Sequence, residues 1–135
     1  MAQLVTPFLM FEGRAEEALD FYIRVIPDSR IGELRRYGPE GPGKQGSIMV
    51  GRATLGGLEV MVSDSPVHHA FTFTPSLSLF LEACSDQEFD AIVAALAEGG
   101  GFLMAPGDYG FSRRFAWLAD RFGVSWQINL DWKEE

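Results

Sequence analysis

The sequence predicts an α+β fold built from two βαβββ modules that follow one another along the chain. The first observation behind this is the order of elements, which reads strand, helix, strand, strand, strand and then repeats after about 65 residues. The second is that a helix lies near the start of each half and a hairpin closes it. The chain of 135 residues is expected to form one domain, with module one at about residues 1–66 and module two at about 72–135.

The first half opens with a short apolar run, Val5–Phe11, which is typical of a strand and is broken by Gly13. Arg14–Ile26 then carries apolar residues at helical spacing on one face and charged residues on the other. Pro27 is expected to end this helix, because proline cannot continue the backbone hydrogen-bond pattern.

Three strands are expected to complete the first half. Arg30–Tyr37 is a candidate edge strand, followed by a Gly/Pro-rich loop over residues 38–46. Ser47–Leu55 and Leu58–Ser63 are apolar runs separated only by Gly56-Gly57. Such a two-residue glycine connection is a strong signal for a β-hairpin.

The second half repeats this pattern after an irregular stretch, Asp64–Pro75. Leu77–Glu82 is expected as a strand, and Ser85 with Glu88 fits the capping box of a helix whose apolar face begins at Phe89. Glycines 99–101 are expected to end the helix. Three more strands are expected at Phe102–Ala105, Phe115–Ala119 and Val124–Leu130.

Composition excludes several classes of function. Eleven basic and 19 acidic residues give a net charge of −8, which disfavours binding to a nucleic-acid backbone. No apolar run reaches the roughly 18 residues of a membrane-spanning helix, and no signal peptide is apparent at the N-terminus. Cys84 is the single cysteine, so no intrachain disulfide can form. A cytoplasmic protein is the default expectation.

Few residues have the spacing of a known reactive site. His68 and His69 are adjacent, so in extended chain they point apart, and a solvated loop is favoured over metal ligation. Cys84 is interpreted as a small buried residue rather than a nucleophile, because no histidine lies in a partner motif.

Several strands have a second, mixed face opposite their aliphatic one. Glu59 and Met61 share such a face in one strand, Phe80 lies on another, and Gln127 lies on the last. This face is either solvent-exposed, as in many alternating strands, or lines a cavity if the sheet curves.

The chain resembles the vicinal-oxygen-chelate superfamily, which includes glyoxalase I, extradiol dioxygenases and bleomycin-resistance proteins. It is most similar to the PhnB-like branch, often labelled 3-demethylubiquinone-9 3-methyltransferase-like. The segments that carry this resemblance are residues 7–13 (PFLMFEG), 15–18 (AEEA), Phe21-Tyr22, 73–75 (FTP) and 120–128 (DRFGVSWQI).

The resemblance implies curved mixed sheets around a shared cavity, helices on the outer face, and a homodimer. In metal-dependent members the first and last strands of each module supply His and Glu ligands. In this sequence the first-strand ligand positions fall near Thr6 or Pro7 in module one and near Ser78 in module two. The last-strand positions fall at Glu59 or Met61 and at Gln127. Neutral oxygens are poor ligands for a transition metal, so no metal or other cofactor is expected and a divalent ion is disfavoured. Methyltransferase activity is also not expected, because no Rossmann-like sheet with a Gly-rich loop is readable.

The first functional hypothesis is a metal-free protein that binds a small, largely apolar organic molecule, in the manner of the bleomycin-resistance branch. The cavity would be lined by Thr6, Phe8, Met61, Ser78, Phe80, Trp117 and Gln127. Aromatic and thioether side chains would supply contact area, while Ser78 and Gln127 would orient polar groups.

Two other hypotheses remain. One is a lyase or isomerase that uses Glu59 as a general base, or a divalent metal held in the same cavity. A buried carboxylate is suited to act as a base. An exposed Glu59 would instead be an ordinary surface residue. The other is a structural or regulatory module without a ligand, whose cavity is filled by Phe and Trp side chains.

Overall fold

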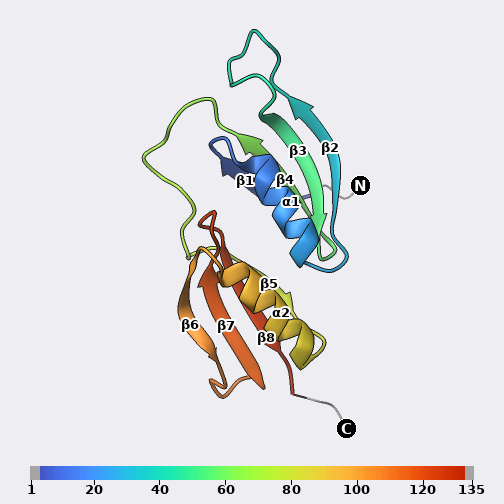
Figure 1. Ribbon diagram of the computed structural model, residues 1–135, viewed down its shortest axis with the longest axis vertical. Coiled ribbons are helices and arrows are strands. Elements are labelled where there is room, and N and C mark those ends of the chain that lie inside the picture. Colours follow the sequence, from blue (N-terminus) through green and yellow to red (C-terminus); the bar gives the residue numbers. More distant parts are fainter. Residues whose placement is uncertain (1–3, 133–135) are drawn as a thin grey trace. The chain divides into compact units, whose positions relative to one another are not determined.

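The computed structural model describes residues 4–132 and divides into two compact units between Ala70 and Phe71. Each unit contains one helix and four strands, and Figure 1 shows the repeated element order along the chain. The α+β class and the order predicted from the sequence are confirmed. Neither helix in the described part of the chain has the length and apolar character needed to cross a bilayer.

The two units have the same sheet topology. The first sheet has the order β1-β4-β3-β2 and the second β5-β8-β7-β6. In each, one outer pair is parallel and the other pairs are antiparallel, so both sheets are mixed as predicted. The first unit comprises β1 (Phe8–Phe11), α1 (Ala15–Val25), β2 (Arg30–Arg36), β3 (Ile48–Leu55) and β4 (Leu58–Asp64). The second comprises β5 (Ser78–Glu82), α2 (Asp86–Ala97), β6 (Gly101–Gly107), β7 (Arg114–Ala119) and β8 (Ser125–Leu130).

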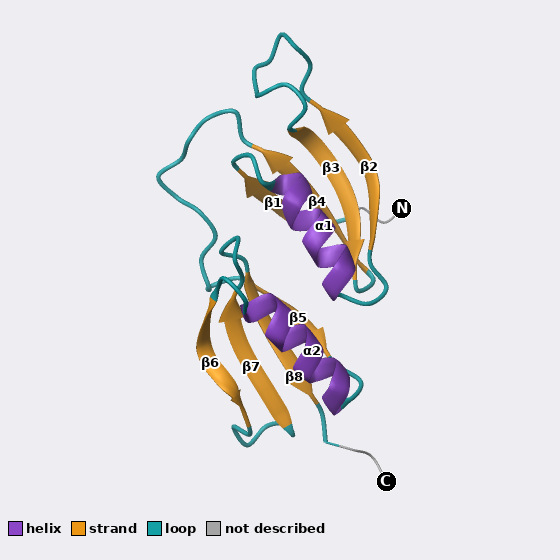
Figure 2. Ribbon diagram, in the orientation of Figure 1, coloured by secondary structure: helices purple, strands orange, loops and turns teal. Residues whose placement is uncertain are grey.

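Each helix packs its apolar face on one side of its own sheet (Figure 2). Leu19 and Tyr22 of α1 are fully buried, as are Phe89 and Leu96 of α2. Burying a side chain of this size contributes roughly 1.5–3 kcal/mol, so these contacts fix the helix to the sheet. The opposite side of each sheet has no helix of its own unit on it.

Most differences from the predicted boundaries have a simple physical reason. β1 begins at Phe8, not Val5, because its parallel ladder with β4 begins where Phe8 lies beside Met61. β6 is longer than expected and includes Pro106, which an edge strand tolerates because it pairs on one side only. Gly101, expected to help end α2, is the first residue of β6.

The predicted hairpin between β3 and β4 is confirmed. Leu55 lies opposite Leu58, and both connecting residues have positive φ angles, 58° for Gly56 and 88° for Gly57. This conformation fits a turn whose twist matches that of the flanking strands, and it favours glycine at both positions.

A distant carboxylate holds the beginning of α1. The N-cap residue Arg14 makes no side-chain cap, and Asp64 at the end of β4 takes that role. One Asp64 oxygen accepts from the backbone N–H groups of Gly13 (2.7 Å) and Ala15 (2.9 Å), and the other accepts from Ile48 (3.0 Å). This buried side chain therefore ties together the helix start and two strands.

The beginning of α2 is held locally instead. Ser85 accepts from the backbone N–H of Glu88, which is one half of the predicted capping box. The Glu88 side chain accepts from the backbone N–H of Cys84, one residue before the N-cap, rather than from that of Ser85. The Cys84 thiol also donates to Glu88, over 3.2 Å. This hydrogen bond and the negative charge of Glu88 raise the pKa of the Cys84 thiol, which disfavours the nucleophilic thiolate. The predicted burial of Cys84 is wrong, because its position just before the N-cap of α2 leaves it exposed.

We expect Asp64→Asn to destabilise the protein by about 2 kcal/mol, because an amide nitrogen then faces a buried backbone N–H and one acceptor is lost. Urea denaturation measures the change. Asp20→Asn, on the exposed face of α1, is the matched control and should stay within about 0.5 kcal/mol of the parent. Equal stability of the two variants would contradict the role given to Asp64.

We expect Glu88→Gln to speed alkylation of Cys84 at pH 7.5, because removing the carboxylate lowers the thiol pKa and raises the thiolate fraction. The rate with iodoacetamide, followed by mass spectrometry, measures the effect. Asp90→Asn removes a charge from the same helix without touching Cys84 and serves as the control. A rate that does not rise in Glu88→Gln would show that Glu88 does not suppress the thiolate.

Candidate functional site

The face of each sheet opposite its helix carries the residues that sequence analysis singled out. We call these the first and second open faces. The first is defined by Phe8, Val50, Arg52, Glu59 and Met61, which alternate with buried, helix-facing residues such as Val60 and Val62. The second is defined by Ser78, Phe80, Trp117, Ser125 and Gln127, which alternate with Leu79, Leu118, Trp126 and Ile128.

On the first open face, two predicted ligand-binding residues lie side by side. Phe8 of β1 is the register partner of Met61 of β4, and the Phe8 side chain is 51% exposed. Together they form an apolar surface of a ring and a thioether. Thr6 lies two residues before β1 begins and is outside this ladder.

Glu59, the candidate general base, is half exposed and ion-paired. Its carboxylate accepts from Arg52 Nη1 at 2.7 Å, and the two side chains are 48% and 49% exposed. This differs from the buried, apolar surroundings that the base hypothesis assumes. Catalysis by Glu59 therefore stays a prediction without structural support.

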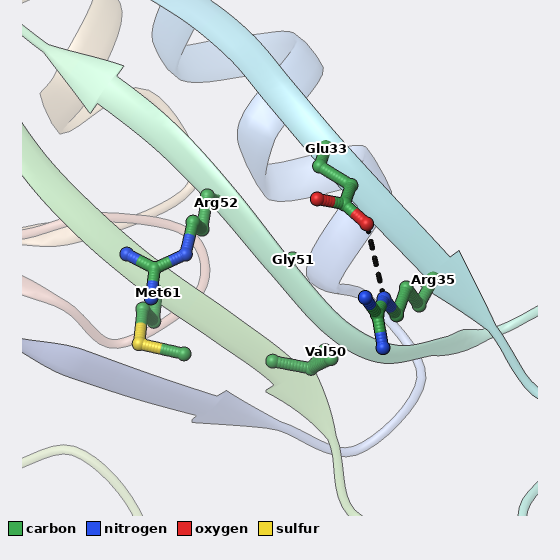
Figure 3. A pocket seen from close by; sticks show the side chains of 6 residues that line it. All are labelled: Glu33, Arg35, Val50, Gly51, Arg52 and Met61. Atoms are coloured by element: carbon green, nitrogen blue, oxygen red, sulfur yellow. Dashed lines mark hydrogen bonds and ion pairs between the residues drawn. The ribbon is translucent and has the colours of Figure 1, made fainter.

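A pocket of about 210 Å³ lies on the first open face. It is lined by residues of β2, β3 and β4: Glu33, Arg35, Val50, Gly51, Arg52 and Met61. In Figure 3 the side chain of Arg52 extends beside Met61, and the ion pair of Glu33 with Arg35 borders β3 on the side of β2. That pair joins Arg35 Nε to a Glu33 oxygen over 3.0 Å.

On the second open face, four predicted residues lie on three neighbouring strands. Phe80 of β5 and Trp117 of β7 are both register partners of Gln127 on β8, one on each side. Ser78 is the register partner of Ser125. Phe80 is 56% exposed, so the face presents a ring, an amide and an indole in one row.

Hydrogen bonds to the buried Ser125 fix two of these side chains. Trp117 Nε1 donates to Ser125 Oγ at 2.9 Å, and the hydroxyls of Ser125 and Ser78 lie 2.6 Å apart. A hydroxyl has one donor and two acceptor sites. Ser78 therefore keeps hydrogen-bonding capacity for a further group. The orientation of the Trp117 indole is set by its hydrogen bond to Ser125.

The predicted site omitted Ser125 and the charged lining of the pocket. Ser125 is on the same face of β8 as Gln127. Its hydrogen bond with Trp117 could be recognised only once β7 was known to pair with β8. Arg52 was detectable, because the two-residue turn sets it opposite Met61 by counting back from Leu55 and Leu58.

The residues present do not fit a divalent transition-metal centre. Gln127, Ser78 and Thr6 offer only neutral oxygens, Met61 offers a thioether, and Glu59 is paired with Arg52. Among residues 4–132 no three His, Cys, Asp or Glu side chains are grouped in a way that could hold an ion. His68 Nδ1 contacts Glu12 at 2.7 Å and His69 Nε2 contacts Ser65 at 2.8 Å, so the two neighbours turn to different partners in a loop, as predicted.

Solved structures with the same fold come from several bacteria. The PhnB protein from Bacillus cereus is 47% identical over 95% of this chain and 99% of its own, with a TM-score of 0.91. Protein PA1353 from Pseudomonas aeruginosa is 27% identical over 96% and 98%, with a TM-score of 0.80. No curated protein matches the sequence.

More distant structures share the fold alone. A glyoxylase/bleomycin resistance protein/dioxygenase domain from Frankia is 14% identical over 98% of this chain and 99% of its own, with a TM-score of 0.67. This likeness confirms the predicted fold. Over residues 3–129 the sequence matches the family described as 3-demethylubiquinone-9 3-methyltransferase, and the chain belongs to that family.

Proposed function

We propose that the protein binds a small, largely apolar organic molecule on its open sheet faces without a metal centre. The row formed by Phe80, Gln127 and Trp117 is the observation that carries this proposal. The half-exposed ring of Phe80 and the indole of Trp117 supply contact area. The amide of Gln127, which lies between them, supplies directional hydrogen bonds.

Two of the remaining predicted residues lie on the first open face, within the first unit. Phe8 and Met61 add a ring and a polarisable thioether, which adapts to ligands of irregular shape. Ser78 adds a hydroxyl whose position is set by Ser125. Thr6 and the homodimer implied by the family resemblance are kept as parts of the proposal that rest on sequence.

We do not extend the proposal to methyl transfer. Each unit is a mixed four-stranded sheet with one helix. A doubly wound parallel sheet has a switch point where nucleotide-containing cofactors bind, and the described residues form no such sheet. Glu59 is likewise left out as a base, because its carboxylate is bound to Arg52.

We expect Phe80→Ala to weaken binding of the neutral probe 2-naphthamide roughly threefold to tenfold, because it removes an aromatic contact. Isothermal titration calorimetry measures the affinity. Phe102→Ala is the matched control, because Phe102 is 46% exposed on the same sheet but is the register partner of the helix-facing Leu118. Equal losses in both variants, or no binding to the parent protein, would overturn the proposal.

We expect the protein, purified without a His-tag, to contain no stoichiometric metal and to show no specific stabilisation by Ni²⁺, Zn²⁺, Mn²⁺ or Fe²⁺. A metal that binds the folded state raises the melting temperature as its concentration exceeds the dissociation constant. Elemental analysis and thermal melts test this. A shift in melting temperature that disappears in Glu59→Ala would reinstate the metal-dependent alternative.

A further inference from the structure

The pocket on the first open face combines two cations with an apolar floor. Arg52 is the register partner of Met61, and Arg35 is the register partner of Val50. The two arginines therefore lie on neighbouring strands, with Arg52 beside Met61 and Arg35 toward Val50 (Figure 3). An apolar surface with a cation beside each of its side chains is complementary to a molecule with an apolar body and an anionic group.

In the free protein each guanidinium group uses one nitrogen atom for a glutamate. Glu59 takes Nη1 of Arg52 and Glu33 takes Nε of Arg35. Neither arginine has another hydrogen bond among the described residues, although a guanidinium group carries five N–H donors. Most of the donor capacity of both side chains is thus available to a ligand.

The two glutamate contacts are also easy to displace. All four side chains are about half exposed or more, at 49% and 48% for Arg52 with Glu59, and 66% and 67% for Arg35 with Glu33. Exposed ion pairs of this kind are worth only about 0–1 kcal/mol. A carboxylate that is partly desolvated against Met61 and binds an arginine through two parallel bonds interacts more strongly than that.

We propose that this pocket binds the carboxylate of a small apolar organic acid, with Arg52 and Arg35 as its recognition residues and Glu59 and Glu33 as displaceable partners that occupy them in the absence of ligand. This inference rests on the proposed function and narrows it for the first open face, where it names the ligand class as organic carboxylates. It gives Glu59 a role in ligand exchange rather than in proton transfer.

The negative net charge of the chain makes a preference for carboxylates over neutral molecules informative. At −8, the protein as a whole repels anions. Non-specific attraction therefore works against a carboxylate probe, and any preference for the anion must arise from a local cluster of cations.

The test compares 2-naphthoate with its neutral counterpart 2-naphthamide by isothermal titration calorimetry. We expect the parent protein to bind 2-naphthoate about tenfold more tightly, as expected for one charge-assisted bidentate contact. Arg52→Gln should abolish the preference while leaving affinity for 2-naphthamide within about twofold. Arg52→Lys should retain part of it, because lysine keeps the charge and loses the fork.

Two further variants separate the local mechanism from a general charge effect. Glu59→Gln should raise affinity for 2-naphthoate about threefold, because Arg52 no longer has a competing carboxylate. Arg14→Gln is the matched control. Arg14 is also ion-paired, to Glu17, and its side chain is 51% exposed, but it precedes α1 and is not part of the pocket. It should leave the preference unchanged.

The outcomes distinguish this inference from the proposed function. If 2-naphthamide and 2-naphthoate bind equally well, the site for apolar molecules stands and the carboxylate pocket is refuted. Unchanged affinity for 2-naphthoate in Arg52→Gln, or an equal loss in Arg14→Gln, refutes it as well. Inorganic phosphate that competes as strongly as 2-naphthoate would show that the arginines bind anions without using the apolar floor, and would also overturn the assignment.

Discussion

Among the described residues each unit has a single helix to cover a four-stranded sheet, and this constraint decides which side of the sheet is buried. The connection from β1 through α1 to β2 places the helix on one side of the sheet, and α2 does the same in the second unit. Apolar side chains on that side are buried against the helix. Among residues 4–132 no helix of the same unit covers the other side, so side chains there are not constrained by packing against a helix.

The two units solve the same local problem differently. Each helix start leaves backbone N–H groups without partners inside the helix. In α2 the chain supplies them from adjacent residues, Ser85 and Glu88. In α1 the corresponding acceptor is Asp64, which comes from the far end of β4 and also binds Ile48. The first unit thus couples its helix to its sheet through one buried carboxylate. Loss of Asp64 would remove hydrogen bonds from both the helix start and β3, whereas loss of a local cap affects the helix start alone.

The open faces have diverged in chemistry while keeping the same register. Met61 in the first unit and Gln127 in the second both pair with a phenylalanine on the parallel side. On the antiparallel side, Met61 is beside Arg52 and Gln127 is beside Trp117. One face therefore combines cations with an apolar floor, and the other combines aromatic rings with an amide. A repeated topology thus carries two surfaces of different chemistry.

The sequence by itself determined the element order, the Gly56-Gly57 turn and the face on which Met61 or Gln127 lies, because periodicity and turn chemistry are local properties of the chain. It also predicted that the residues at the matching positions are poor ligands for a transition metal, since ligand chemistry depends on residue type. The tertiary structure alone decided that Asp64 supports α1 and that Arg52 binds Glu59. The Asp64 contact depends on how the end of β4 meets the start of α1, which no local pattern specifies. The Arg52 contact depends on side-chain conformation, which the alternation of the two hairpin strands does not specify.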